Sequence, residues 1–364
     1  MKGMLMEARL DLYTDYLLSS FGQTSATKLS ERLDKALSHD VFTDMLATAP
    51  FDGRALWKEV KPLVRQIESE DGVVVVDDTI AHKPYSEIND LVSIHWDHSR
   101  QEYVRGINCL SLLYCSEGVR IPIGFEAVIK TLRSDLTTRE EEWKSNRTKN
   151  EMFRDMLHWA YQNAVPFRYV LGDCWFSNAK NINAVLAIGK HYLGAIKSNT
   201  QVALSEQDRQ RGIFVAINTL GLEPGTVRRV FLRSVNQAVA ICRDVFINKD
   251  NSIGELFLLT TDLTQRYQSI ISTYQKRWEV ETYHKDLKQN AGLERSPARA
   301  IDRQSAHLFA SVCAFAKFER LKIKEQKNHF ALKGQLYIKA LQAAFAELRR
   351  LQNLYQSEAT LAKA

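Results

Sequence analysis

The sequence predicts an α/β protein in which helices flank a mixed β-sheet. Four consecutive valines, residues 73–76, follow an Asp-Gly turn signal and predict a buried central strand. Two further strand-like runs, at about 103–115 and 119–129, come next in the chain. Beyond residue 150 helical and strand-like segments alternate, which is typical of strands joined by crossover helices. Adjacent strands followed by alternating elements therefore favour a mixed sheet.

Helices are expected at both ends of the chain. Apolar residues recur at helical spacing up to about residue 70, which predicts several short helices in an N-terminal region, residues 1–70. This region is a candidate for DNA binding, and a purely structural helical cap is the alternative. Two more helices are expected at about 302–326 and 333–354, so that residues 331–364 form a C-terminal helical segment.

The middle of the chain is expected to form one core interrupted by an insertion. Its first part, residues 71–198, contains the strands above and a charge-rich loop at about 133–149. Residues 199–254 contain short β-rich runs separated by Gly, Pro and Asn turn signals, which predict a small antiparallel insertion. Residues 255–330 complete the core with a strand and one long helix at about 265–290.

Composition limits the class of protein only weakly. A formal net charge of +6 suits an anionic partner such as nucleic acid, but many other proteins are equally basic. The five cysteines form no C-x-x-C pair, which favours buried free thiols in a reducing compartment. The first residues lack the layout of a signal peptide, and no run of about 18 apolar residues occurs. A cytoplasmic protein without a membrane span is expected.

Acidic residues follow two of the predicted strands. Asp77 and Asp78 come directly after the valines, and Asp173 ends the strand-like run 167–173. Because side chains alternate across a sheet, only one of the paired acids can face a given site. Acids at the ends of neighbouring strands meet at the edge where open sheets bind ligands, although an Asp there can also be a simple turn former.

A third acid lies on the long predicted helix. At about 100° per residue, one arc of this helix carries Tyr274, Arg277, Glu281, His284, Lys285 and Lys288. One interpretation is a solvated charged face with ion pairs such as Arg277–Glu281. The other is a surface that faces a phosphate backbone, on which the acid binds a metal ion, since an unpaired carboxylate would repel phosphate.

The spacing on this helix resembles a known signature. Tyr274-x2-Arg277-x3-Glu281-x6-Lys288 is similar to the Tyr-Arg-Glu-Lys signature of the insertion-sequence-four family of bacterial DDE transposases. The neighbours that also fit this pattern are Trp278, His284 and Lys285.

The two strand acids extend the resemblance. Asp78-Thr79 after a valine-rich strand resembles the first catalytic Asp of the family, and Leu-Gly-Asp173 before an aromatic residue resembles the second. The resemblance covers about residues 70–320. It implies a ribonuclease-H-like core that carries a β-rich insertion between the second and third acids.

The resemblance further implies an enzyme that cuts DNA at transposon ends and transfers the strands into target DNA. Asp78, Asp173 and Glu281 would be the catalytic and metal-binding residues and would hold two Mg²⁺ ions, for which Mn²⁺ can substitute. Asp77 is the alternative first ligand. The residues expected to contact DNA are Tyr274, Arg277, Lys285 and Lys288.

The same resemblance implies the partners. They are double-stranded DNA, both the inverted repeats of the transposon ends and the target, and a second copy of the chain in a homodimeric DNA complex. The protein would act in the bacterial cytoplasm, associated with the nucleoid when bound to DNA. Two other functions stay open, a non-catalytic transposase-derived DNA-binding protein and a ribonuclease-H-like nuclease.

Several aromatic and histidine residues have two interpretations. The family commonly uses a Trp of the insertion to stabilise a DNA hairpin, but residues 199–262 contain none, so the hairpin step stays open. Trp175 and Phe176 are expected to pack in the core. Residues 95–98 (His-Trp-Asp-His) have no further Cys or His ligand nearby and predict a loop or strand lip beside the site. Aromatic candidates for stacking on a base are Phe214, Phe231, Phe246 and Phe257.

Overall fold

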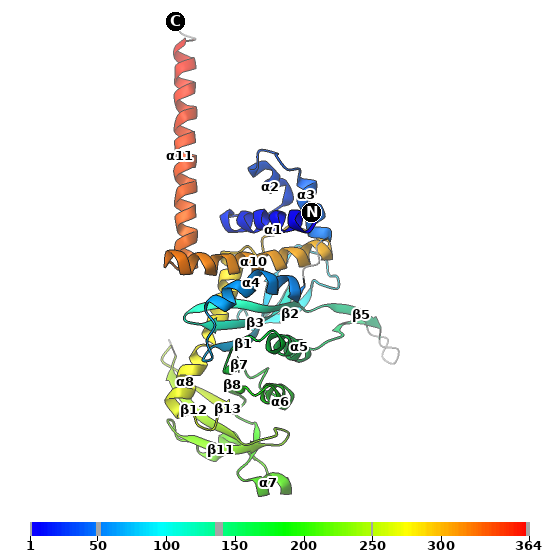
Figure 1. Cartoon of the computed structure of the whole chain (residues 1–364), viewed down its shortest axis with the longest axis vertical. Helices are drawn as coiled ribbons and strands as arrows, with labels where there is room; N and C mark the ends of the chain where they lie inside the picture. The colour runs from blue at the N-terminus through cyan, green and yellow to red at the C-terminus, as the bar shows by residue number, and fades with distance from the viewer. Residues whose placement is uncertain (1, 49–51, 135–140, 249, 362–364) are drawn as a thin grey trace.

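A large mixed β-sheet forms the centre of the computed structural model, which describes residues 2–48, 52–134, 141–248 and 250–361 (Figure 1). The strands are β1 (Val73–His82), β2 (Ser93–Asp97), β3 (Glu102–Ser116), β4 (Val119–Ala127), β5 (Lys130–Ser134), β6 (Glu141–Ser145), β7 (Tyr169–Gly172), β8 (His191–Ile196), β9 (Gln201–Ala203), β10 (Val215–Ala216), β11 (Val227–Leu232), β12 (Val239–Ile247) and β13 (Ile253–Thr260). The main sheet has the order β10-β9-β11-β12-β13-β8-β7-β1-β3-β2, and β4 also pairs with β3.

Helices surround this sheet and form both ends of the chain. They are α1 (Lys2–Ser19), α2 (Ala26–Arg32), α3 (His39–Thr48), α4 (Gly53–Gln66), α5 (Lys149–Gln162), α6 (Ala179–Ala187), α7 (Glu206–Arg211), the 3₁₀ helix η1 (Ile217–Leu220), α8 (Tyr267–Gln275), α9 (Trp278–Gln289), α10 (Ile301–Glu325) and α11 (His329–Leu361). α1, α3 and α4 pack against α10, and α11 projects from the body of the molecule (Figure 1). No helix of the described residues is both long and apolar enough to cross a membrane.

β1 is an interior strand of the sheet, between β7 and β3, and its four valines are fully buried. β1 pairs antiparallel with β3 along its whole length, and β3 pairs antiparallel with β4. On its other side β1 pairs parallel with β7, and β7 pairs parallel with β8. Three antiparallel strands beside two parallel ones form a ribonuclease-H-like core, which confirms the predicted fold class. The edge strand β2 contains His95 and Asp97, as expected of a strand lip.

The prediction of one long helix at 265–290 is wrong in one respect. The structure has two helices there, α8 and α9, separated by Lys276 and Arg277. The backbone N–H groups of Lys276 and Arg277 donate to carbonyl groups three residues earlier, at 3.2 and 2.8 Å. The next turn is closed in the same way, by Glu279 and Val280. Such i→i−3 bonds tighten the chain locally, and so they interrupt the regular helix.

Two other segments differ from the prediction. The prediction of a loop at 133–149 is wrong in part, because β6 lies within it and pairs antiparallel with β5, which begins before it at Lys130. Residues 135–140 lie outside the described residues. The strands of the β-rich insertion pair antiparallel as predicted, but they continue the main sheet, because β12 pairs with β13 and β13 with β8. The insertion therefore extends the central sheet on the side of β8.

Gly172→Ala tests how tightly β7 packs beside Asp173. A Cβ atom at position 172 would lie 2.7 Å from the Tyr192 hydroxyl oxygen and 3.1 Å from Phe176 Cβ. Both neighbours are fully buried and cannot move aside freely. We expect the free energy of unfolding, measured by urea denaturation, to fall by about 1–3 kcal/mol. Gly22→Ala is the control, since its Cβ would meet nothing within 4 Å; an equal loss in both variants would contradict the tight packing.

Candidate active site

Asp77 and Asp78 lie inside β1, not at its end, because the strand continues to His82. The parallel pairing of β1 with β7 covers only Val73–Val75, so both acids lie beyond the point where β7 ends. Their side chains point to opposite faces of the sheet, as alternation along a strand requires. The two faces are covered by different helices.

Asp78 faces α5. The Lys149 Nζ, in the first turn of α5, lies 2.6 Å from Asp78 Oδ1, and the Asn108 Nδ2 donates to Oδ2 at 2.7 Å. Both carboxylate oxygens thus have a donor from the protein.

Asp77 faces the other side, where α9 packs against β1. Its Oδ2 lies 3.9 Å from Arg277 Nη1. Burial, together with the nearby carboxylates of Asp78 and Asp173, raises the pKa of Asp77 to about 7, although Arg277 acts in the opposite direction. Asp77 is therefore a partly buried acid whose charged form is disfavoured.

Asp173 is held by the turn that follows β7. Its Oδ1 accepts the backbone N–H groups of Trp175 at 2.9 Å and Phe176 at 3.3 Å. This turn fixes the carboxylate beyond the end of β7, within electrostatic reach of Asp77.

Arg277 links the strand acids to the third acid. Its Nη2 donates to Glu281 Oε1 at 2.6 Å, and its guanidinium lies 5.7 Å from the centre of the Tyr274 ring. Arg277 lies at the turn between α8 and α9, so the interruption of the predicted helix occurs beside the acids. Arg277 thus connects Asp77 with Glu281 on one face of the sheet, with Asp173 within electrostatic reach of Asp77, whereas Asp78 lies on the opposite face.

This acidic set suits a hard divalent cation in its chemistry. Carboxylate oxygens are the ligands that Mg²⁺ prefers, and the raised pKa of Asp77 marks a place where positive charge is lacking. Within the described residues, however, no three His, Cys, Asp or Glu side chains are close enough together to hold a metal ion. Glu281 is turned to Arg277, and its side chain would have to leave Arg277 to act as a ligand.

The arc of polar residues on α8 and α9 is not a uniformly solvated face. Tyr274 is only 8% exposed, and burial raises its pKa to about 12. His284 is buried, which lowers its pKa to about 3 and keeps it neutral, and its Nε2 has no hydrogen-bond partner among the described residues. Lys285 is exposed, with its Nζ 5.0 Å from the centre of the Phe330 ring. The Lys288 Nζ lies 3.6 Å from Glu294 Oε1.

Two exposed tryptophans flank the acids. Trp278 begins α9 and is 62% exposed, and Trp175 is 60% exposed with the Lys149 Nζ 5.1 Å from its ring centre. The prediction that Trp175 packs in the core is wrong, whereas Phe176 is fully buried as predicted. Sequence reasoning also missed Lys149 and Asn108, because no local pattern connects them with β1.

The phenylalanines of the insertion have different environments. Phe257 is buried, and Phe246 is 43% exposed. Phe231 lies between the guanidinium groups of Arg209 and Arg229, each 5.6 Å from the ring centre. Nothing in these contacts favours one of them for stacking on a base.

Replacing Asp77 tests the electrostatics of this site. The pKa of the Asp77 carboxyl group rises from 3.8 to about 7 on folding, so the folded protein binds a proton there more tightly than the unfolded chain does. The contribution of this proton to stability is fully present below pH 3.8 and is lost as the pH rises through 7. Asp77→Asn removes the buried charge, so at pH 8 and without divalent cations we expect its Tm to exceed that of the wild type by about 2–4 °C. The increase should disappear near pH 4. Differential scanning calorimetry measures both.

Asp78→Asn is the matched control. It removes an acid whose charge is paired with Lys149, so its Tm at pH 8 should fall. A lower Tm for both variants at pH 8 would contradict the distinction between the two acids.

Comparison with known proteins identifies the family of the chain. A model of the transposase DDE domain matches residues 142–316, which include Asp173 and Glu281. A model described as DDE superfamily endonuclease matches residues 4–212, which include Asp77, Asp78 and Asp173. A search among curated proteins finds no match. Since the second of these models covers more than half of the chain, the protein belongs to the DDE superfamily of endonucleases and transposases.

Proposed function

We propose that this protein is the transposase of an insertion sequence related to the insertion-sequence-four family, and that it transposes DNA by cut and paste. In this proposal it cleaves DNA at the ends of the element and transfers the strands into target DNA, in the bacterial cytoplasm. The observation that carries the proposal is the position of the Tyr-Arg-Glu-Lys signature, because Arg277 of this signature connects Glu281 with Asp77.

We propose Asp77, Asp173 and Glu281 as the catalytic acids and metal ligands, with Asp77 in place of Asp78. Asp77 shares a face of the sheet with α9, whereas Asp78 has both oxygens engaged by Lys149 and Asn108. Two Mg²⁺ or Mn²⁺ ions bound there would neutralise charge on the phosphate during in-line displacement at phosphorus. The protein's part is to hold the three acids on β1, on the turn after β7 and on α9.

Arg277, Lys285 and Lys288 are the proposed contacts to DNA phosphates. When Glu281 turns toward a cation, the guanidinium of Arg277 becomes free to bind phosphate through two parallel hydrogen bonds. Tyr274 is buried under Arg277, so we propose that it supports the guanidinium and does not reach the DNA.

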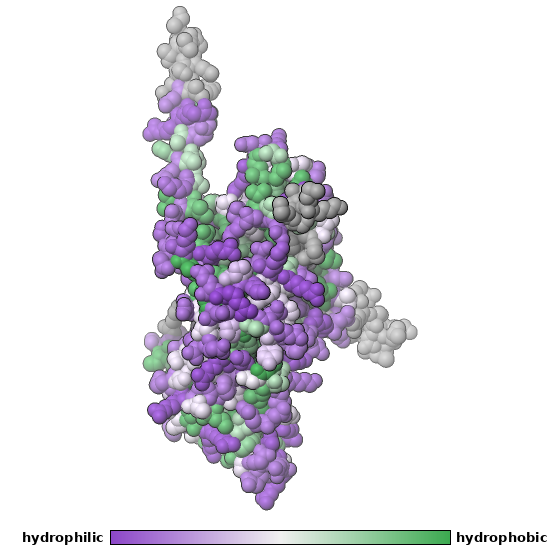
Figure 2. Space-filling view, in the orientation of Figure 1, coloured by the Kyte–Doolittle hydropathy of each residue, from purple (hydrophilic) through white to green (hydrophobic). Residues whose placement is uncertain are grey.

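A second copy of the chain is the proposed partner of α11. Four apolar side chains of this projecting helix, spaced alternately by three and four residues, are between 50% and 61% exposed: Ile338, Leu341, Phe345 and Leu348. This spacing forms a seam that fits another helix of the same kind. Figure 2 shows apolar side chains interspersed with polar ones along this helix. A dimer would hold both ends of the element in one complex.

Substitution of the acids tests the proposed chemistry. The substrate is duplex DNA that carries the inverted repeats flanking the gene, and strand nicking is measured with Mg²⁺ and, separately, with EDTA. Since losing a group that merely supports a ligand costs about 10–100-fold, Asp77→Asn, Asp173→Asn and Glu281→Gln should each reduce nicking by more than about 100-fold. DNA affinity, measured by gel shift, should change little.

Asp78→Asn is again the matched control and should retain nicking within about tenfold. If Asp78→Asn abolished nicking while Asp77→Asn did not, the assignment of the first ligand would be reversed. Mg²⁺-dependent nicking by a folded Asp173→Asn variant at the wild-type rate would refute the proposed site as a whole.

Charge on the apolar seam of α11 tests the proposed dimer. A double variant, Leu341→Glu and Phe345→Glu, would place like charges at the contact, so it should sediment as a monomer at concentrations where the wild type dimerises with or without DNA. Ala343→Glu introduces the same charge on the opposite side of the helix and should leave dimerisation unchanged. A wild type that remains monomeric even on DNA would exclude the dimer.

A further inference from the structure

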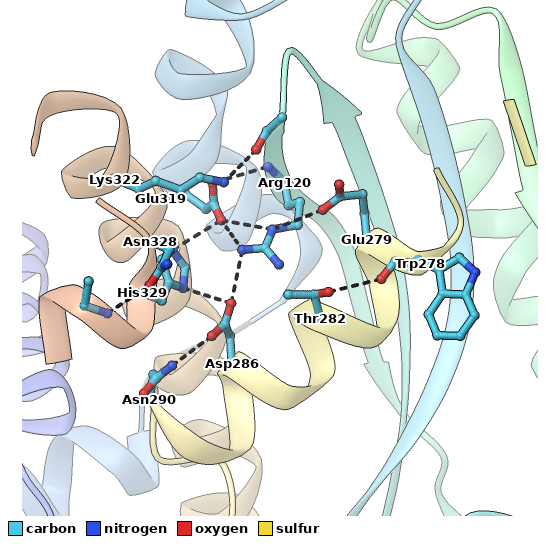
Figure 3. A network of polar contacts seen from close by, with 12 residues as sticks. Arg120, Trp278, Glu279, Thr282, Asp286, Asn290, Glu319, Lys322, Asn328 and His329 are labelled. Carbon is cyan, nitrogen blue, oxygen red and sulfur yellow. Dashed lines mark hydrogen bonds and ion pairs between the residues drawn. The ribbon is translucent and has the colours of Figure 1, made fainter. Parts of the chain in front are cut away.

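A buried cluster of charged side chains lies beside α9 and includes Asp286 of that helix (Figure 3). It joins four elements of the fold: β4, α9, α10 and the first residue of α11. Its members, all 5% exposed or less in their side chains, are Arg120, Asp286, Glu319 and His329.

Arg120 is the centre of this cluster. Its Nη2 donates to Asp286 Oδ2 at 3.1 Å and lies 3.0 Å from Glu319 Oε1, while its Nε donates to Glu319 Oε1 at 3.2 Å. A third acid, Glu279, lies 3.6 Å from the Nε and is partly exposed. The guanidinium thus connects α9 with β4 and α10.

His329 bridges the same two acids from α11. Its Nδ1 lies 3.3 Å from Asp286 Oδ2, and its Nε2 lies 3.2 Å from Glu319 Oε1. The ring packs against Phe315 and Phe318 of α10, with ring centres 4.9 and 5.1 Å away. Burial alone would lower the pKa of His329, but the two carboxylates raise it above its ordinary value, which favours the charged ring.

Lys322 completes the charge balance. Its Nζ lies 3.2 Å from Glu319 Oε2 and donates to the carbonyl oxygen of Gly118 at 2.6 Å, both of which are outside α9. Three cationic groups then face three acids. Removing charged groups from water costs free energy, so a buried network of this kind contributes little to the net stability of the protein. The loss of one member nevertheless destabilises the protein strongly, because it leaves a buried charge without a partner. The charged cluster therefore favours the one arrangement of β4, α9, α10 and α11 in which all its members are paired.

The arrangement that the cluster fixes includes the rotation of α9. Asp286 follows Glu281 by five residues, which at about 100° per residue places the two side chains about 140° apart around the helix axis. Any rotation that frees Asp286 from Arg120 would therefore also turn Glu281 away from β1. Glu279 is seven residues before Asp286 and lies on the same side of the helix as Asp286.

We propose that Arg120 and His329 are positioning residues, which hold Asp286 and thereby fix the rotation at which α9 presents Glu281 to Asp77. The effect on metal binding rests on the proposed function, because it assumes that Glu281 is a ligand. The effect on the orientation of α9 does not.

The orientation of α9 can be followed by ¹⁹F NMR of the full chain labelled with 5-fluorotryptophan. Trp278 begins α9, and its resonance is assigned with Trp278→Phe. In Arg120→Lys, which keeps the charge but loses the planar fork, we expect the Trp278 resonance to shift or broaden. The resonances of Trp57 and Trp159, which pack together at 5.4 Å between α4 and α5, should stay unchanged and show that the variant is folded.

Two further variants complete the test. His329→Gln removes the second partner of Asp286, should have the same effect, and decides the question if Arg120→Lys does not fold. Lys322→Met is the matched control, since it alters the cluster without removing a partner of α9, and its Trp278 resonance should match the wild type. An unchanged Trp278 resonance in a folded Arg120→Lys or His329→Gln would overturn the positioning role.

Metal affinity provides the second readout. Mn²⁺ binding, measured by electron paramagnetic resonance, should weaken about tenfold in Arg120→Lys and His329→Gln and remain unchanged in Lys322→Met. If the wild type binds no Mn²⁺ in the presence or absence of DNA, the proposed function fails, and the NMR comparison still decides the role of Arg120. Unchanged Mn²⁺ affinity together with a shifted Trp278 resonance would overturn the link between the cluster and Glu281.

Discussion

The packing of α9 against one face of β1 is the contact on which the site depends. Alternation along β1 sends Asp77 and Asp78 to opposite faces, so the helix that carries Glu281 can meet only one of them. Because β7 ends before it reaches the two acids, the sheet leaves room beside Asp77 for the carboxylate of Asp173. Asp173 therefore comes within electrostatic reach of Asp77 at the point where one strand stops short and its neighbour continues.

The two sides of α9 have different electrostatic environments. Toward β1, Arg277 lies near both Asp77 and Glu281, and burial together with the carboxylates of Asp78 and Asp173 raises the pKa of Asp77. Away from β1, Arg120, Lys322 and His329 face three carboxylates, so charge is balanced inside the protein.

Much of this arrangement was predictable from local pattern, but its decisive parts were not. The valine run, the strand after it and the Glu-bearing helix each have a sequence period that indicates them. No such signal shows which of Asp77 and Asp78 faces α9. The alternation of side chains along β1 places the two acids on opposite faces, but it does not indicate which face α9 covers. The partners of Arg120 lie 166 and 199 residues later in the chain, so an arginine within an apolar strand gave no indication of its role. The turn at Arg277 is likewise set by tertiary contacts, since no Pro or Gly marks it.

His329 is both the first residue of the projecting helix α11 and a partner of Asp286 in α9. The start of α11 therefore contacts the helix that bears Glu281 in two places, through His329 and through Phe330, whose ring lies 5.0 Å from Lys285 Nζ. In the proposed dimer, these two contacts would lie between the surface that joins the two copies and the helix that bears Glu281.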